Sequence, residues 1–489
     1  MAMLQRVLYV ITLANVIVWT AIAIWATITS RQNQNSWRAA PAWDESSLQI
    51  KPAGDYYEVL HDAASQRAGS QVSLKGEARK GSCWEFARDT TEPLSGRYKP
   101  RSTVLPLGGT VPRAYWRWPG NISKEAFDNA AAKEWPGCMH CMNVVHYKVV
   151  SGKLYVLEKA WGDWQRNVTE EMLQVVLYLF PIPDMDFLLH YGDGCTNGLP
   201  VISWNVCRQF QDAGFTMPSY TVWQRALGPT QLSTYRACLN KRYPADKRKS
   251  VVFWRGSTTD TVHGSFNKDN YLKVFRILLH QFARNHTDIL DVRIANPLNC
   301  DAFVKEQIND TGALIGFEAF NQHCAILDVD GNGWSDRFGQ MVHFNTPILK
   351  LASNHTGFFE HLMAPNVAID QFSKDLSDLP EKARQLIADC QTGGSNSRAR
   401  KLARSMQAIS QMLMDHVGIA EAFAYTLHTY KNLSSWTFDS SLTGFKQVNR
   451  ACCSEARVPK AFADAVTAKV AGGATASPAV GRRSLAAQR

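Results

Sequence analysis

The sequence has no local motif of a nucleic-acid-binding protein. Lysine and arginine together number 53 against 43 aspartates and glutamates, a formal net charge of +10. No zinc finger, RNA-binding motif or basic run with interleaved aromatic residues accompanies that charge. We therefore expect the positive charge to meet an anionic small ligand or a membrane surface, and not nucleic acid.

The sequence also lacks a complete zinc motif of the CxxC type. Cys138 and Cys141 form one such pair among 11 cysteines, but no second pair follows, so a local disulfide or two separate bridges are favoured. In an oxidising compartment most of the cysteines would pair. Their odd number leaves at least one free thiol or an intermolecular bond.

Charged residues are absent from residues 7–28, a run of 22 positions. A helix of that length can cross a bilayer. The run exceeds the core of a cleavable signal peptide, about 7 to 15 residues, which favours an uncleaved anchor. We expect residues 1–6 to be a cytoplasmic tail, residues 7–28 a transmembrane signal anchor, and the remainder to be lumenal. The six Asn-x-Ser/Thr sequons fit that address: Asn121, Asn167, Asn285, Asn309, Asn354 and Asn432.

What the sequence does contain is a strand, a loop, a helix and a second strand within residues 325–351. Residues 325–329 and 347–351 are short apolar runs typical of buried strands, and Phe338, Met341 and Val342 have helical spacing. The pattern predicts a parallel βαβ unit. The loop at residues 330–333 follows its first strand, where open α/β sheets bind ligands, and its glycines permit positive φ and close approach of the backbone.

Several interpretations of this loop stay open. Asp328, Asp330, Asn332 and Gly333 match the first six positions of an EF-hand calcium loop, but Gly339 stands at position twelve, where that loop needs a bidentate Glu. Asp328 and Asp330 form an Asp-x-Asp triplet of the kind that holds a divalent metal on a diphosphate. Ser335 and Arg337, at a helix start, would instead bind phosphate directly. The simplest alternative is a solvated turn N-capped by Ser335.

Other segments place candidate residues on an α/β framework. Residues 187–189 are predicted to be a strand that delivers Asp193 into the following loop. Residues 251–255 are a β-rich run ending in an Arg-Gly-Ser turn, which would present a guanidinium, amides and hydroxyls to an anion. A helix is expected over residues 270–285, and a β-hairpin over residues 147–157. Alternating strands and helices predict α/β layers.

An ordered series of motifs resembles glycosyltransferase family 90, which includes protein O-glucosyltransferases and fungal capsule-associated xylosyltransferases. The series comprises DVDGNGWSDRFGQMVHFNTPILKL at residues 328–351, Phe358-Phe359-Glu360, and DLSDL at residues 375–379. The similarity extends from about residue 183 to about residue 430. It implies an α/β fold of the GT-B type, in which two Rossmann-like lobes face a cleft, here preceded by the membrane anchor.

The resemblance also sets the expected domain boundaries. Residues 29–101 would be a stem and N-terminal extension. Residues 102–240 would be the acceptor-side lobe with the catalytic Asp, and residues 241–431 the nucleotide-sugar lobe with closing helices. Residues 432–489 would be a C-terminal extension with a disordered tail.

The implied catalytic residue is Asp193, which matches the family's catalytic Asp. Gly194 and Cys195 follow it where many members have a proline. In the donor site, His263 stands where some members have a further arginine, and Arg276 could replace it. The implied donor-binding residues are Arg255, Gly256, Ser257, Arg276, Asp330, Gly331, Asn332, Gly333, Trp334, Ser335, Arg337 and Phe338.

These residues imply an inverting glycosyltransferase that moves glucose or xylose from a UDP-sugar to a hydroxyl of a protein or glycan acceptor. Asp193 would take the acceptor's proton, and the arginines would stabilise the leaving diphosphate. We expect no metal cofactor, and a single-pass location in the Golgi or endoplasmic reticulum membrane. Two alternatives stay open: a metal-dependent transferase using Asp328 and Asp330, and a non-catalytic membrane-bound module that binds calcium or sugar.

Overall fold

The computed structural model describes residues 81–102, 120–132, 144–157, 164–194, 196, 198–207, 214–260, 264–363, 365–394, 396–450, 452–453 and 458–471. All of them belong to one compact unit, Tyr57–Arg489. The predicted span at residues 7–28, the Cys138 and Cys141 pair, Cys195, His263 and the tail after residue 471 lie outside the described residues. Within the described part, no helix has the length and apolar character needed to cross a membrane.

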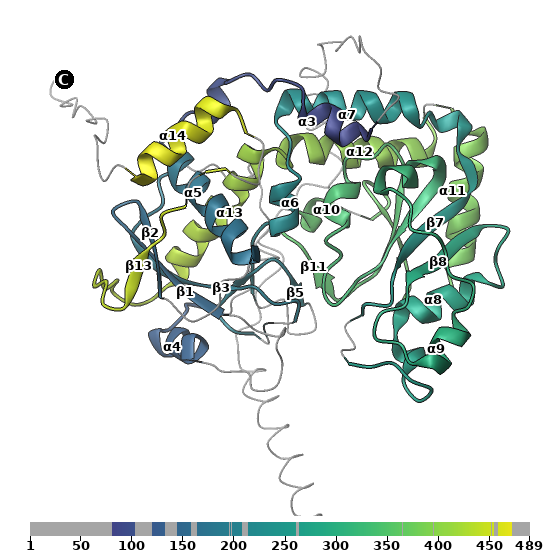
Figure 1. Cartoon of the computed structure of the whole chain (residues 1–489), viewed down its shortest axis with the longest axis horizontal. Helices are drawn as coiled ribbons and strands as arrows, with labels where there is room; N and C mark the ends of the chain where they lie inside the picture. Colours follow the sequence, from purple (N-terminus) through teal and green to yellow (C-terminus); the bar gives the residue numbers. More distant parts are fainter. Residues whose placement is uncertain are drawn as a thin grey trace, which may run out of the picture. The chain divides into compact units, whose positions relative to one another are not determined.

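The first sheet has six strands in the order β13-β2-β1-β3-β4-β6; β13, β2, β1 and β3 are labelled in Figure 1. Its strands are β1 (Val144–Val150), β2 (Lys153–Leu157), β3 (Met185–His190), β4 (Ile202–Ser203), β6 (Phe215–Thr216) and β13 (Phe445–Gln447). β1 and β2 form the predicted antiparallel hairpin, and its turn residues Ser151 and Gly152 have φ of 50° and 72°. Only β3, β4 and β6 pair in parallel. The sheet is therefore mixed, since β13, β2, β1 and β3 pair antiparallel with one another. The two-residue turn between β1 and β2 requires that direction.

The second sheet has five strands, all parallel, in the order β12-β10-β9-β7-β8. Its strands are β7 (Lys249–Ser257), β8 (Leu290–Asn296), β9 (His323–Asp328), β10 (Ile348–Leu351) and β12 (Asp370–Phe372). β9 and β10 are the two predicted strands of the βαβ unit, with Ile348 opposite Ile326. The helix between them, α10 (Phe338–Met341), is a single turn.

The strand order of the second sheet reverses between β7 and β9. From β7 the chain moves to β8 on one side, and then crosses to β9, on the other side of β7, before continuing outward to β10 and β12. Connections therefore leave the carboxyl ends of β7 and β9 in opposite directions, which makes this point the topological switch point of the sheet. Open parallel sheets bind their ligands at such a switch point.

Helices cover both sheets, and the core lies between the layers. They include α4 (Lys124–Ala132), α5 (Trp164–Leu179), α6 (Tyr220–Gln224), α8 (Phe275–Ala283), α9 (Ala302–Gln307), α11 (Leu379–Thr392), α12 (Arg398–Leu413), α13 (His416–Leu433) and α14 (Lys460–Ala471). α8 is shorter than the helix predicted at residues 270–285. Tyr271–Lys273 form a separate 3-10 turn, and the Asp260 carboxylate accepts the Phe275 amide at 2.6 Å, so that the helix begins there.

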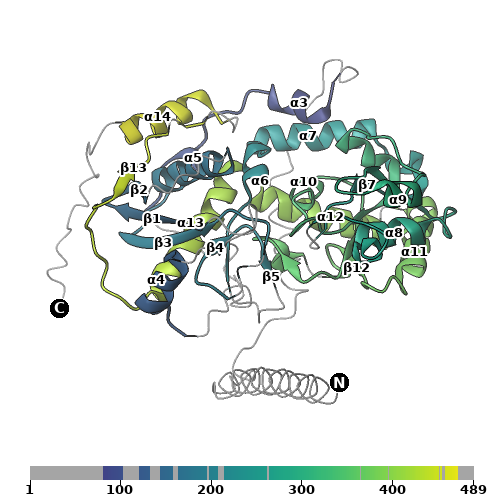
Figure 2. The same cartoon turned by 60° about the horizontal axis from the view of Figure 1, so that its bottom comes forward.

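Long-range links tie distant segments to these layers. A disulfide joins Cys83 of α3 (Cys83–Arg88) to Cys238 of α7 (Pro229–Arg242), and α3 lies along α7 in both views (Figures 1 and 2). The last part of the predicted stem is thus attached to the folded body. A second disulfide, Cys324 to Cys390, joins β9 to α11.

A third link is a two-stranded antiparallel pair between β5 (Val206–Cys207) and β11 (His355–Thr356). β5 follows β4 of the first sheet, and β11 follows β10 of the second. The pair therefore brings together the connections that leave the carboxyl ends of strands in the two sheets.

Candidate active site

Asp193 lies in the loop after β3, at the carboxyl end of that strand. Its backbone carbonyl accepts a hydrogen bond from Asn205 Nδ2 at 2.9 Å, and its carboxylate Oδ2 accepts one from Asn332 Nδ2 at 3.2 Å. No described residue donates to the other carboxylate oxygen, and the side chain is only partly buried. Asp193 is thus an oriented carboxylate with one free oxygen, as a general base requires.

The glycine loop at residues 330–333 contacts the Asp193 loop directly. A Cβ added to Gly333 would lie 2.4 Å from the Asp193 carbonyl oxygen, and one added to Gly331 would lie 3.3 Å from the Arg276 guanidinium. Neither glycine has φ in the left-handed region, contrary to the expectation from sequence. A side chain at residue 333 would therefore collide with the Asp193 backbone, whereas one at residue 331 would press against Arg276.

Arg276, on the first turn of α8, occupies the switch point between β7 and β9. Its Nη1 donates to the Ser257 carbonyl at 3.2 Å and to Thr259 Oγ1 at 2.5 Å, beyond the end of β7. Its Nε donates to the Asp330 carbonyl at 2.7 Å and its Nη2 to the Val329 carbonyl at 3.3 Å, beyond the end of β9. A guanidinium has five N–H donors, so these four bonds leave one for a ligand.

Arg337 has more of its donors free. Its Nη1 donates to the Arg255 carbonyl at 2.5 Å, and its other N–H groups bond no described residue. The guanidinium carbons of Arg337 and Arg276 lie 6.0 and 5.5 Å from the centroid of the Trp254 ring. A Cβ on Gly256 would lie 2.5 Å from that ring and 3.2 Å from Arg337, which explains the glycine.

The two arginines lie close enough to affect each other. The pKa of Arg276 is lowered to about 10, chiefly by burial and also by the charge of Arg337. Burial likewise lowers the pKa of Arg337, while the charge of Asp328 opposes that shift. An anion bound beside both guanidiniums would relieve their repulsion and compensate for their desolvation.

Arg255 belongs to this region by its backbone, and its side chain is already paired. Its Nη1 donates to the Asp291 carbonyl at 2.9 Å, its Nη2 to the Asp291 carboxylate at 2.7 Å, and its guanidinium stacks over Phe253 at 4.5 Å. Asp291 thus neutralises the Arg255 guanidinium, which was predicted from the sequence to bind the diphosphate of the donor. The carbonyl of Arg255 orients Arg337.

A buried ionic network lies beneath the glycine loop. Asp328 accepts hydrogen bonds from Ser335 Oγ at 2.5 Å and from Lys350 Nζ at 2.8 Å. Lys350 Nζ lies 3.1 Å from Glu360 Oε1, which also accepts the Trp334 indole N–H at 2.7 Å. Burial would lower the pKa of Lys350, but Asp328 and Glu360 outweigh it and raise that pKa. The network therefore fixes both ends of the loop around a charged lysine.

Asp330 is the carboxyl group of the loop itself. One of its oxygens accepts the Ser353 hydroxyl, and the other is buried without a partner among the described residues. Burial raises the pKa of Asp330 to about 7; Lys350 and Ser353 oppose the shift, and Asp328 adds to it. The folded chain therefore keeps the proton of Asp330 to a higher pH than an exposed carboxyl would.

The remaining donor-site predictions lie around the loop. Ser257 Oγ is 3.3 Å from Thr259 Oγ1, next to Arg276. Trp334 and Phe338 are buried, and both rings pack against Phe359, so they support the loop from below. The single turn α10 is too short to provide a useful helix dipole, and its N-cap residue is Arg337 and not Ser335.

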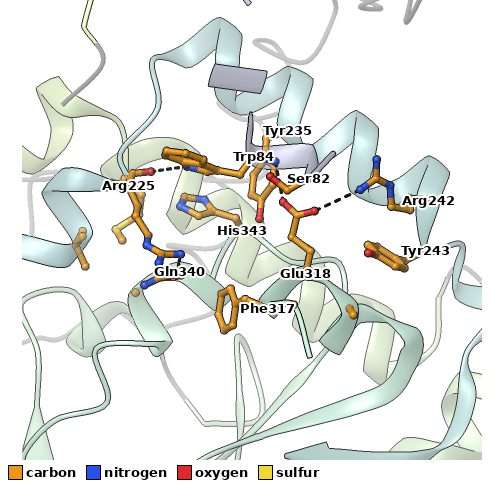
Figure 3. A pocket seen from close by; sticks show the side chains of 15 residues that line it. Ser82, Trp84, Arg225, Tyr235, Arg242, Tyr243, Phe317, Glu318, Gln340 and His343 are labelled. Carbon is orange, nitrogen blue, oxygen red and sulfur yellow. Dashed lines mark hydrogen bonds and ion pairs between the residues drawn. The ribbon is translucent and has the colours of Figure 1, made fainter. Parts of the chain in front are cut away.

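A cavity of about 460 Å³ lies elsewhere, between α3, α7 and the segment that leads into β9 (Figure 3). Its walls include Trp84, Tyr235 and Phe317, and Arg242 lies 3.7 Å from Glu318 at its edge. It shares no residue with the predicted site. The cavity is on the side where β9 begins, whereas Asp193 and the glycine loop lie where strands end.

Asn205 and Lys350 were not predicted from the sequence. Lys350 could have been, because it interrupts the apolar strand ILKL, and a buried ammonium requires a carboxylate partner. Asn205 carries no such signal, since its role depends on segments far apart in the chain. As for metals, the described ranges contain no group of three or more His, Cys, Asp or Glu placed to hold an ion.

The glycine loop thus joins the Asp193 carboxylate, after β3, to the arginine-containing switch point of the second sheet. The sequence model of Glycosyl transferase family 90 matches residues 116–471, and the chain belongs to that family. The chain is 20% identical over 288 residues to Protein O-glucosyltransferase 3 of Homo sapiens, covering 55% of this chain and 51% of that protein. It is 23% identical over 253 residues to Protein O-glucosyltransferase 2 of Danio rerio, covering 49% and 47%. The chain thus spans about half the length of these relatives.

Proposed function

We propose that this chain transfers glucose or xylose from a UDP-sugar to a hydroxyl of a protein or glycan acceptor, with inversion at the anomeric carbon. The observation that carries the proposal is the 3.2 Å hydrogen bond from Asn332 to Asp193. It sets a carboxylate with a free oxygen beside the loop at the β7–β9 switch point. The names of the two relatives, both protein O-glucosyltransferases, support a glucose donor and a protein acceptor.

The proposed reaction is a single displacement. The acceptor oxygen attacks the anomeric carbon while Asp193 takes its proton, and the bond from that carbon to the diphosphate breaks. UDP leaves with the electron pair of that bond. Arg337, with its free donors, and the remaining donor of Arg276 take up the charge that develops on the diphosphate. One displacement on one face of the sugar inverts its configuration.

We propose that the reaction needs no metal ion. One oxygen of Asp328 accepts the Ser335 hydroxyl and the other the Lys350 ammonium, so the first residue of the Asp-x-Asp triplet is already engaged. The metal-dependent alternative predicts that excess chelator abolishes transfer and that Mn²⁺ or Mg²⁺ restores it. Transfer that persists in chelator supports the present proposal.

We also propose that the two sheets are the cores of two GT-B lobes in a lumenal enzyme anchored by residues 7–28. Disulfides such as Cys83–Cys238 and Cys324–Cys390 form in oxidising compartments. Among the sequons, Asn121, Asn285, Asn309, Asn354 and Asn432 are exposed and accessible for glycosylation. Full-length protein should stay in membranes washed with alkaline carbonate, and its release would contradict the anchor.

The reaction itself is tested by UDP release from the full-length protein in detergent. UDP-glucose, UDP-xylose and other nucleotide sugars are supplied with and without candidate acceptors, beside an Asp193→Asn variant. We expect release from a UDP-sugar to rise when an acceptor is added, and the variant to lack that rise. If no nucleotide sugar is turned over, the non-catalytic sugar-binding alternative is favoured.

A further inference from the structure

Asn205 is fully buried and hydrogen-bonded on two sides. Its Nδ2 donates to the Asp193 carbonyl at 2.9 Å, and its Oδ1 lies 3.0 Å from His355 Nδ1. Because a carbonyl can only accept, the amide nitrogen of Asn205 must face Asp193, which turns the amide oxygen towards His355. His355 must therefore carry its hydrogen on Nδ1 and donate it. The Asp193 carbonyl thus fixes the orientation of the Asn205 amide, and the hydrogen bond from His355 holds that amide in place.

These two residues come from the connections of different sheets. Asn205 immediately precedes β5, His355 begins β11, and Cys207 and His355 are paired opposite each other in the β5–β11 ladder. The His355 amide donates to Ser353 Oγ at 2.8 Å, and the Ser353 hydroxyl donates to Asp330. A continuous path of hydrogen bonds thus runs from Asp330, in the glycine loop, through Ser353, His355 and Asn205 to the backbone of Asp193.

We propose that His355 is a positioning residue for the transfer reaction. Through Asn205 it fixes the backbone of the Asp193 loop, and with it the place of the Asp193 carboxylate relative to the glycine loop. The inference rests on the proposed role of Asp193 as the base. His355 touches neither the acceptor nor the sugar in this proposal, so its loss acts on geometry and not on proton transfer itself.

The surroundings of His355 suit a constant donor. The pKa of His355 is lowered to about 4, chiefly by burial; the charges of Lys350 and Lys374 act in the same direction and that of Asp260 opposes them. Above about pH 5 the ring is therefore neutral, with its single hydrogen held on Nδ1 by Asn205. The bond to Asn205 is present in the charged ring as well, so it persists throughout the pH range in which an enzyme of this kind is assayed.

Two substitutions separate positioning from general packing. His355→Asn keeps an N–H close to the place of Nδ1, and His355→Leu has a comparable size without a donor. We expect His355→Leu to lower kcat by about tenfold or more, because small displacements of a reacting group cost on that scale. Donor KM and UDP affinity, measured by calorimetry, should change less than about twofold. His355→Asn should retain most of the wild-type kcat.

Asn205→Asp provides a second route to the same test. It keeps an acceptor for His355 but removes the donor to the Asp193 carbonyl, so we expect the same loss of kcat as in His355→Leu. The double variant should be no worse than either single variant, because both break one path. Hydrogen exchange in a peptide covering residues 191–194 should quicken in His355→Leu and Asn205→Asp and stay slow in His355→Asn.

The outcomes are distinct. Suppose that the wild type is active and Asp193→Asn is not. Equal losses of kcat in His355→Leu and His355→Asn would then overturn the positioning role. A wild-type kcat in each of the single variants His355→Leu and Asn205→Asp would overturn it as well. If the wild type itself transfers nothing, the proposed function fails. Hydrogen exchange then still decides whether His355 holds the Asp193 loop: unchanged exchange at residues 191–194 in His355→Leu overturns the inference.

Discussion

The side-chain amide of Asn332 donates to Asp193 Oδ2 over 3.2 Å, so the loop after β9 orients a carboxylate that belongs to the loop after β3. The bond uses one carboxylate oxygen and leaves the other free. In the proposed reaction the loop that receives the donor therefore also aims the base.

Asp193→Asn should reduce transfer by at least about 10², because it removes the group that accepts the proton while nearly preserving shape. The amide oxygen can still accept from Asn332, so UDP affinity and melting temperature should change little. The loss should appear in kcat. Asp184→Asn, which alters an exposed carboxylate just before β3, is the matched control and should behave as wild type. More than about a tenth of wild-type transfer in Asp193→Asn would exclude Asp193 as the base.

Arg337→Lys should weaken donor use by about 1 to 3 kcal/mol of transition-state stabilisation, because an ammonium cannot bind the Arg255 carbonyl and two phosphate oxygens in one plane. Kinetics with the UDP-sugar, together with UDP calorimetry, measure the effect. Arg284→Lys, at the exposed C-terminal end of α8, is the control for the same exchange. Equal kinetics in the two variants would place Arg337 outside the donor site.

Lys350→Met should destabilise the fold by about 3 to 5 kcal/mol, because it leaves the buried carboxylates of Asp328 and Glu360 without their cation. Urea unfolding followed by fluorescence measures the change. Lys382→Met, which breaks the partly exposed pair with Asp378, should cost less than about 1 kcal/mol. A similar loss of unfolding free energy in both variants would mean that the ion pairs beneath the glycine loop contribute no more than a partly exposed pair.

Asp330→Asn should change how stability depends on pH. A carboxyl whose pKa is raised to about 7 holds a proton in the folded chain that the unfolded chain releases near pH 4. Its contribution to stability is therefore greatest below pH 4 and is lost as the pH rises to 7. Asparagine mimics the protonated form at every pH. The melting temperature of Asp330→Asn, compared with that of the wild type, should therefore rise as the pH increases from 5 to 8. A difference in melting temperature that is the same at every pH would contradict the raised pKa.

The local framework could be predicted from the sequence because its signals are local. The strands β9 and β10, the hairpin of β1 and β2, and the strand that delivers Asp193 all follow from short apolar runs and turn residues. The side-chain direction of Arg255 could not, because Asp291, its partner, comes from β8. The path from His355 to Asn205 could not either, since it depends on a ladder between residues about 150 positions apart.

The ladder of β5 and β11 also limits how far the Asp193 loop and the glycine loop can move relative to each other. Drawing the first sheet away from the second at Asp193 would break the pairing of Cys207 with His355 and of Val206 with Thr356, as well as the bonds of Asn205. The Asp193 loop and the glycine loop are therefore held in register by the fold before any substrate binds. In the proposed reaction, the freedom of Asp193 relative to the glycine loop is lost once, when the chain folds, so that only the substrates give up freedom in each cycle.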